Sequence, residues 1–149
     1  MNKLERCRAA MAYHGRGFNC AQSVLEAFRD LTGLTEDQCR RIATGLGGGF
    51  RSGSICGAAS GAVLVLGMLH PHNEEDMAQK AYTAKITKEL VSRFTKRFND
   101  KLDCRDLLQE KNLDAVVEAE QLGATKHCEL LIISAVSILY DYLEELKEE

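Results

Sequence analysis

The six cysteines are the residues of this sequence best able to do chemistry, because a thiolate is both a nucleophile and a soft metal ligand. No two of them form a C-x-x-C pair, so neither a thioredoxin-type motif nor a zinc ribbon is present. A shared site must therefore be assembled by the fold from distant segments. The six are Cys7, Cys20, Cys39, Cys56, Cys104 and Cys128.

Four of the cysteines fall in the first turn of a predicted helix. Asn19 and Asp103 are predicted N-caps, and a cysteine follows each of them directly. The start of a helix has unpaired N–H groups and about half a unit of positive charge, which lowers the pKa of a thiol. The placement predicts one joint site and leaves Cys7 and Cys39 as buried, inert side chains. The predicted working sulfurs are those of Cys20, Cys56, Cys104 and Cys128.

The elements that must position these sulfurs are helices. Apolar residues recur with a period near 3.6, and almost nothing alternates with period two. We therefore predict an all-α, single-domain helical bundle over residues 1–149. The expected helices are Leu4–His14, Cys20–Thr32, Thr35 to about Leu46, Ile55–Leu69, a long helix from a cap at Asn73 to about Phe98, Cys104–Glu110, Leu113–Gln121, and Lys126–Lys147 after a cap at Thr125.

Small residues surround Cys56. The glycine-rich stretch before it is predicted to be a loop, and the helix Ile55–Leu69 carries glycine, alanine and serine at six successive positions. Neighbouring helices can approach such a surface closely, so this helix is expected to be central. Four glycines would also let the backbone approach a cofactor held by the sulfurs. They are Gly47, Gly48, Gly49 and Gly57.

Composition excludes several classes of protein. A net charge of −3 gives no global attraction to nucleic acid or to an anionic membrane. The stretch Ile55–Leu69 is too short to span a bilayer, and the N-terminus has no apolar core of a secretory signal. We therefore expect a cytoplasmic protein whose thiols stay reduced. Six reduced thiols indicate metal binding, redox chemistry or inert burial.

The sequence resembles the C_GCAxxG_C_C family of redox-active proteins, which is named for four cysteines. The resemblance covers nearly the whole chain, and its most specific part begins at Cys56. It implies a small helical domain and favours electron transfer with an iron–sulfur centre over thiol exchange. The matching segments are Phe18-Asn19-Cys20-Ala21-Gln22-Ser23-Val24, Gly47-Gly48-Gly49-Phe50, Cys56-Gly57-Ala58-Ala59-Ser60-Gly61-Ala62, Cys104-Arg105-Asp106-Leu107-Leu108 and Cys128.

Three functions remain open from the sequence. The first is an iron–sulfur cluster, or less favourably Zn²⁺, held by the sulfurs. His127, next to Cys128, is either a replacement ligand, a proton donor or a surface histidine. The second is a metal-free thiol–disulfide protein, and the third is a structural or regulatory bundle with inert cysteines. The first two require an electron-transfer or thiol-redox protein as partner, and no catalytic residue is assigned. A homodimer would bury the helix whose segment Leu130–Leu143 is apolar nearly all round.

Overall fold

Four of the helices, α1, α2, α4 and α6, begin at a polar residue whose side chain caps the first turn. In the computed structural model, which describes residues 1–149, Asn19 caps α2 and Thr35 caps α4, each in a capping box with the glutamine three residues later. Gly33 ends α3 in the left-handed conformation (φ 77°) that glycine tolerates best. The elements are α1 (Lys3–Gly15), α2 (Cys20–Ala27), α3 (Arg29–Thr32), α4 (Glu36–Ile42), η1 (Thr44–Leu46), η2 (Gly49–Gly53), α5 (Gly57–Leu69), α6 (Met77–Arg97), α7 (Cys104–Leu107), α8 (Val117–Gln121) and α9 (His127–Lys147).

Several boundaries differ from the prediction. The expected helix Cys20–Thr32 is broken at Phe28 (φ −119°), a residue that is fully buried. Helix α6 begins at Met77 and not directly after Asn73, because the Asp76 side chain accepts two backbone hydrogen bonds in its first turn. The pattern of apolar residues located the α-helices, whereas these two boundaries depend on core packing and on a competing cap. The glycine-rich stretch that was predicted to be a loop contains the short helical turn η2.

Three further boundaries also move. Helix α4 stops at Ile42 and is followed by the short turn η1, so the predicted helix does not continue to Leu46. Helix α8 is shorter than Leu113–Gln121, since it begins only at Val117. The cap of α9 is Lys126, one residue after the expected one, and its N–H donates to a carboxylate oxygen of Glu129.

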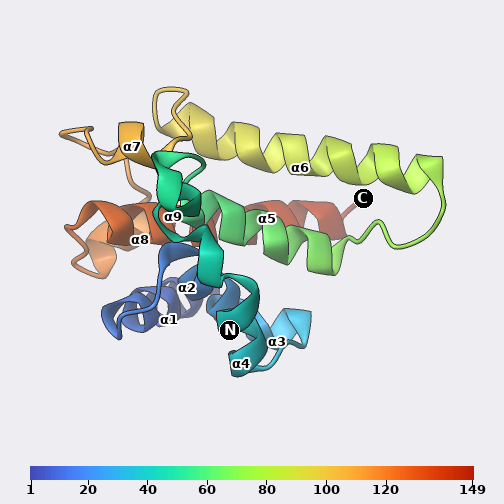
Figure 1. Ribbon diagram of the computed structural model, residues 1–149, viewed down its shortest axis with the longest axis horizontal. Coiled ribbons are helices and arrows are strands. Elements are labelled where there is room, and N and C mark those ends of the chain that lie inside the picture. Colours follow the sequence, from blue (N-terminus) through green and yellow to red (C-terminus); the bar gives the residue numbers. More distant parts are fainter.

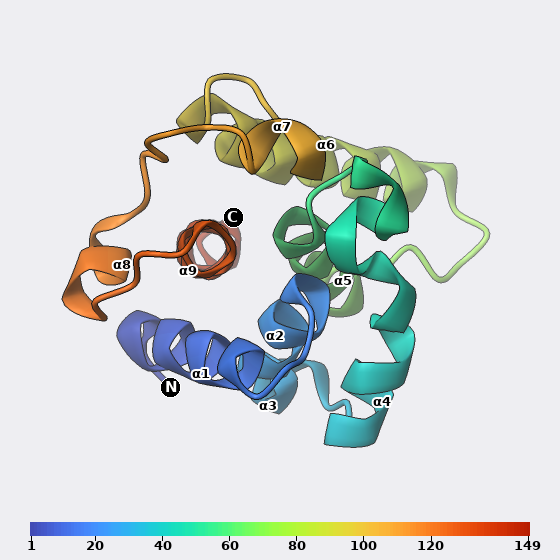
Figure 2. The same cartoon turned by 60° about the vertical axis from the view of Figure 1, so that its left-hand side comes forward.

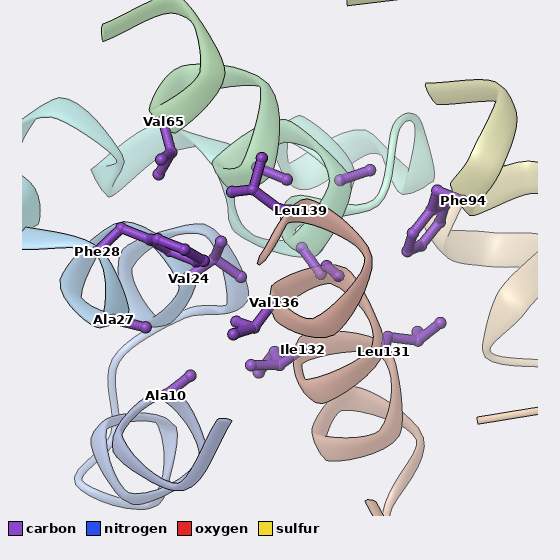
Figure 3. Close-up of a cluster of buried hydrophobic side chains, with 14 of the residues drawn as sticks. Ala10, Val24, Ala27, Phe28, Val65, Phe94, Leu131, Ile132, Val136 and Leu139 are labelled. Carbon is purple, nitrogen blue, oxygen red and sulfur yellow. The ribbon is translucent and has the colours of Figure 1, made fainter. Parts of the chain in front are cut away.

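Helix α9 lies inside the bundle and contacts α1, α5, α6 and α8 (Figure 2). Its residues are buried around nearly the whole circumference. Figure 3 shows Ile132, Val136 and Leu139 of this helix facing the cluster that contains Val24 and Phe28. Because a single chain covers α9 by itself, its apolar surface gives no reason to expect a homodimer. None of the helices, α9 included, combines the length and the apolar character that crossing a membrane requires.

The small-residue helix α5 lies in the interior, between α2, α6 and α9 (Figure 1). Its closest neighbour is α2, and the contact depends on Gly61. A Cβ atom at that position would lie 2.9 Å from the carbonyl oxygen of Ala21 and 3.0 Å from Cβ of Val24. Both distances are shorter than van der Waals contact. The crossing of α2 and α5 therefore requires glycine, and this crossing sets the position of the two cysteines at the starts of the helices.

A buried arginine joins α1 to the α2–α3 corner. Arg6 is only 4% exposed, and it donates to both carboxylate oxygens of Asp30 (2.6 and 3.0 Å) and to the carbonyl oxygen of Ala27. Its guanidinium also lies over the ring of Phe28. The hydrogen bond from Arg6 holds the pKa of the Asp30 carboxyl below its ordinary value.

We expect Asp30→Asn to lower the free energy of unfolding by about 1–3 kcal/mol at pH 7, because it leaves a buried cation poorly paired. Since the pKa of Asp30 is lowered in the folded state, its contribution is complete above its ordinary pKa of 3.8. That contribution is lost as the pH falls through the folded-state pKa. Urea unfolding of wild type and variant from pH 3 to pH 7 tests this expectation.

The matched control for this change is Asp37→Asn, which removes an exposed ion pair with Arg41 on α4. An exposed pair of this type is worth less than about 0.5 kcal/mol. Equal destabilisation by the two variants, or a difference from wild type that does not shrink in acid, would contradict the role given to Arg6 and Asp30.

Candidate functional site

One histidine and two cysteines meet where three helices come together. His14 lies in the last turn of α1, Cys20 is the first residue of α2, and Cys128 is the second residue of α9. One ligand atom of each lies within 4.8 Å of the other two. Imidazole nitrogen and thiolate sulfur are ligands of zinc and iron, whereas calcium and magnesium prefer oxygen. The group has donor atoms of the kind that bind a transition-metal ion, gathered at one place in the fold.

Cys20 is held in place by the residue before it. The side-chain oxygen of Asn19 accepts from the N–H of Gln22 (2.8 Å), and the Gln22 side chain accepts from the N–H of Asn19 (2.8 Å). The amide nitrogen of Asn19 donates to the carbonyl oxygens of Ala43 and Thr44. One side chain therefore caps α2 and also ties its start to the segment after α4.

Cys56 and Cys104 are brought together by a short antiparallel bridge. Ile55 pairs with Asp103, and the N–H of Cys104 donates to the carbonyl oxygen of Ser54 (2.7 Å). Side chains alternate between the two sides of such a pairing, so residues 56 and 104 lie on the same side of it. Cys56 is the N-cap residue of α5, and Cys104 is the first residue of α7. The bridge therefore makes these two cysteines neighbours although they lie far apart in the sequence.

The two pairs of cysteines lie within electrostatic reach of each other. A charge on Cys128 raises the pKa values of Cys20, Cys56 and Cys104. A charge on Cys104 likewise raises those of Cys20 and Cys56. Neither Cys56 nor Cys104, however, belongs to the compact group formed by His14, Cys20 and Cys128. The structure thus gathers the four sulfurs in one region without making them equidistant.

Position at a helix start does not lower the pKa of every one of these thiols. Burial raises the pKa of Cys56 to about 11, although the backbone N–H groups of Ala58 and Ala59 in α5 act to lower it. Burial also raises the pKa of Cys104. The pKa of Cys20 is raised chiefly because the Cys20 thiol interacts with Cys128. Only Cys128 is shifted down, to about 6, chiefly because the Cys20 thiol donates to its sulfur. Desolvation outweighs the helix dipole at Cys56 and Cys104, and the interaction with Cys128 outweighs it at Cys20.

We expect Cys128 to be the most reactive thiol of the metal-free protein. At pH 7 a thiol with a pKa of about 6 is mostly thiolate, whereas burial raises the pKa of Cys7 to about 12 and that of Cys39 to about 11. Iodoacetamide in the presence of a chelator, followed by peptide mass mapping, should modify Cys128 more than about tenfold faster than either. Its rate should fall as the pH drops below 6. Equal rates for the three thiols would contradict the assignment.

The predicted cofactor-binding glycines have packing roles that the structure makes visible. A Cβ atom on Gly57 would lie 3.2 Å from Cβ of Cys20, so this glycine lets α5 begin directly against the site. Gly47 packs against the Asn19 side chain in the same way. Gly48 and Gly49 have positive φ angles, and so do Phe50 and Arg51 after them. The loop is thus a left-handed turn, and a direct role of these glycines in binding a cofactor remains a proposal.

His14 is the member of this candidate site that sequence reasoning missed. The sequence places it only at the end of the predicted helix Leu4–His14, and it favours His127 as the histidine of the site because His127 precedes Cys128. In the structure the Nε2 atom of His127 contacts the carbonyl oxygen of Glu110. Burial lowers the pKa of His14, which favours the neutral imidazole that a metal requires. A sequence signal did exist, since the tight turn at residues 15–19 must bring the end of α1 back to the start of α2.

The remaining two cysteines are fully buried, as predicted. Cys7 packs in the core, and its thiol donates to the carbonyl oxygen of Ile133 at 3.7 Å. Cys39 is also completely inaccessible to solvent. All six cysteines are free thiols in the structure. These two positions therefore supply control substitutions for any experiment on the site.

The fold and the site define a small all-α protein with a cluster of cysteines at the starts of its helices. The chain belongs to the family described as "Putative redox-active protein (C_GCAxxG_C_C)", which it matches over residues 18–142. No curated protein and no solved structure matches it.

Proposed function

We propose that this protein is a metal-dependent electron-transfer protein with an iron–sulfur centre. His14, Cys20 and Cys128 hold one part of the centre, and Cys56 and Cys104 hold the other. The observation that carries the proposal is the compact His14–Cys20–Cys128 group, whose ligand atoms lie within 4.8 Å of one another. A centre of this kind supplies one-electron chemistry when it is bound.

The spacing of the donors supports more than one metal atom. Metal–sulfur bonds in such sites are about 2.3 Å long, so two sulfurs on one ion lie at most about 4.6 Å apart. Cys56 and Cys104 lie outside the group of ligand atoms that are within 4.8 Å of one another. A cluster with several irons offers separate coordination positions and suits such an extended set of ligands better than a single zinc ion does.

The surroundings of the sulfurs supply what an anionic centre needs. The backbone N–H groups of Ala58 and Ala59 at the start of α5 act to lower the pKa of Cys56, so they favour negative charge on its sulfur. Cys20, Cys104 and Cys128 are partly exposed, whereas Cys56 is 3% exposed. A partner protein that exchanges electrons would therefore reach the centre on the side of the three exposed sulfurs. The free thiols fit a reducing compartment such as the cytoplasm.

Metal analysis after purification without oxygen tests this proposal. We expect iron and acid-labile sulfide in stoichiometric amounts, together with absorption bands in the visible range that bleach on reduction. Loss of these bands in Cys20→Ala, with retention in Cys39→Ala, would support the assignment of ligands. A colourless protein that contains neither iron nor sulfide, even after reconstitution with both, would contradict it.

A second function is favoured by the Cys20–Cys128 pair itself. The thiolate of Cys128 would attack a disulfide of a partner protein, form a mixed disulfide and release one partner thiolate. Cys20, after loss of its proton to solvent, would attack the sulfur of Cys128 and release the second partner thiolate. The net result transfers two electrons from this pair to the partner and leaves a disulfide between Cys20 and Cys128.

The two functions differ in what oxidation does to the purified protein. In the second, a metal-free sample titrates with two electrons, and mass spectrometry finds a bond between Cys20 and Cys128. In the first, the number of electrons released on oxidation follows the iron content of the sample. Alkylation after denaturation then finds all six cysteines free. Variants of Cys56 and Cys104 give a further distinction, because only an extended metal centre needs their sulfurs.

A further inference from the structure

Helix α6 is strongly basic, although the chain as a whole is acidic. It carries six cationic side chains and one carboxylate, so its net charge is +5 in a chain whose net charge is −3. The helix lies along one edge of the molecule (Figure 1). It packs through Ile86, Leu90 and Phe94, whose spacing of four residues places them on one face. The opposite face is therefore turned to solvent.

Four lysines of α6 are exposed and form no ion pair. They are Lys80, Lys85, Lys88 and Lys96. The one carboxylate of the helix, Glu89, is engaged by Arg93, which also pairs with Glu145 of α9. Because no carboxylate of the chain contacts the four lysines, their charge is available to attract a partner.

The basic surface formed by these lysines is limited in length and has few apolar side chains. Acidic residues bound it, since residues 74–76 are all acidic and Asp100 follows the helix. From Lys80 to Lys96 the helix rises by about 24 Å. No large apolar side chain is exposed between Lys85 and Lys96. A short charged surface without an apolar anchor suits a weak, transient complex, the kind that electron-transfer proteins form.

One end of this basic surface lies near the cysteines. Helix α6 ends at Arg97, and Cys104, whose sulfur is partly exposed, begins α7 a few residues later. Figures 1 and 2 both show α7 beside this end of α6. A partner on the lysines nearest this end would therefore also lie beside the candidate site.

We propose that the four lysines of α6 form the docking surface for an electron-transfer protein that carries an acidic patch around its own redox centre. This inference rests on the proposed function, because it names the partner of the same centre. Carboxylates of the partner steer the encounter toward the lysines. Since exposed ion pairs are individually weak, the complex also dissociates quickly.

Titration of the full-length protein with a plant-type ferredoxin, an acidic electron carrier, tests the docking surface. At an ionic strength of about 0.01 M, where screening is weak, amide NMR shifts should saturate with a Kd of about 10–100 µM. The shifted amides should lie in α6 and α7, and cytochrome c, a basic carrier, should shift neither. Absence of saturable binding of ferredoxin, or shifts confined to other helices, would overturn the proposal.

A charge-reversed variant and a matched control complete the test. Lys88→Glu combined with Lys96→Glu should weaken ferredoxin binding about tenfold or more, and this difference should shrink at about 0.15 M salt. Arg8→Glu is the control, because Arg8 is likewise exposed and unpaired but lies on α1. Its Kd should stay within about twofold of wild type. Equal weakening by both changes would show that only the net charge matters and would overturn the proposal.

The binding assay does not require the metal centre, so the two proposals can fail separately. Iron and acid-labile sulfide, measured on the same samples, should be equal in wild type and in the charge variants. Ferredoxin binding through α6 by a protein that cannot be loaded with iron and sulfide contradicts the proposed function alone. A loaded protein whose α6 binds only duplex DNA, or only vesicles of phosphatidylcholine and phosphatidylserine, overturns the docking surface alone.

Discussion

Replacing Gly61 with alanine is expected to lower the free energy of unfolding by about 2–3 kcal/mol, because the added methyl group overpacks the contact between α5 and α2. The new Cβ atom would meet the backbone carbonyl oxygen of Ala21 at 2.9 Å, and a backbone atom cannot rotate away. For a chain of this length, such a change lowers the melting temperature by about 4–12 °C. Thermal unfolding followed by circular dichroism measures it.

Gly67→Ala is the matched control in the same helix. Nothing lies within 4 Å of a Cβ atom at that position, and the residue is exposed. The substitution should stabilise the protein by about 0.5–1 kcal/mol, since alanine favours a helix over glycine. The two variants therefore have effects of opposite sign. If Gly61→Ala were neutral or stabilising, the close crossing of α2 and α5 would be wrong.

The Gly61 variant should also weaken the site. The crossing of the two helices determines where Cys20 and Cys56 lie, since each stands at the start of one of them. A shift of the crossing by a few tenths of an ångström therefore changes the distances between sulfurs. Metal content measured on folded Gly61→Ala at low temperature should be lower than in Gly67→Ala.

The second large effect is expected from Cys128→Ala, which should lower the affinity for a transition metal by more than about 100-fold. Metal binding is worth roughly 10–16 kcal/mol in structural zinc sites, so each ligand contributes several kcal/mol. Cys128 is also the ligand whose pKa, about 6, makes it available as thiolate at pH 7. Titration of the metal-free protein with Co²⁺, followed by its thiolate charge-transfer absorption, gives the affinity.

Three comparisons decide how this result is interpreted. Cys39→Ala removes a fully buried sulfur that is not one of the proposed ligands. The Co²⁺ affinity of this variant should stay within about threefold of wild type. His14→Ala should lose at least about tenfold, because the imidazole belongs to the compact group. If Cys128→Ala binds Co²⁺ as tightly as Cys39→Ala, the His14–Cys20–Cys128 group does not hold a metal.

The local chemistry of the chain was readable without the fold. Asn19 and Thr35 cap helices in the structure, because a capping box is completed within four residues and needs no tertiary contact. The burial of Cys7 and Cys39 followed from the general behaviour of cysteine. The expected lowering of four thiol pKa values was wrong for three of them. The pKa depends on desolvation by residues from other helices, which sequence position does not reveal.

The sequence by itself determined an all-α chain, the starts of α2 and α4 at their capping boxes, and the family whose cysteines it carries. Only the tertiary structure decided which side chains meet. His14 joins Cys20 and Cys128, whereas His127, the neighbour of Cys128 in sequence, contacts Glu110. The physical reason is the range of the interactions: a cap is fixed by hydrogen bonds between residues three positions apart. The meeting of three helix ends depends instead on close packing over the whole core. At Gly61 this packing leaves no room for even one added methyl group.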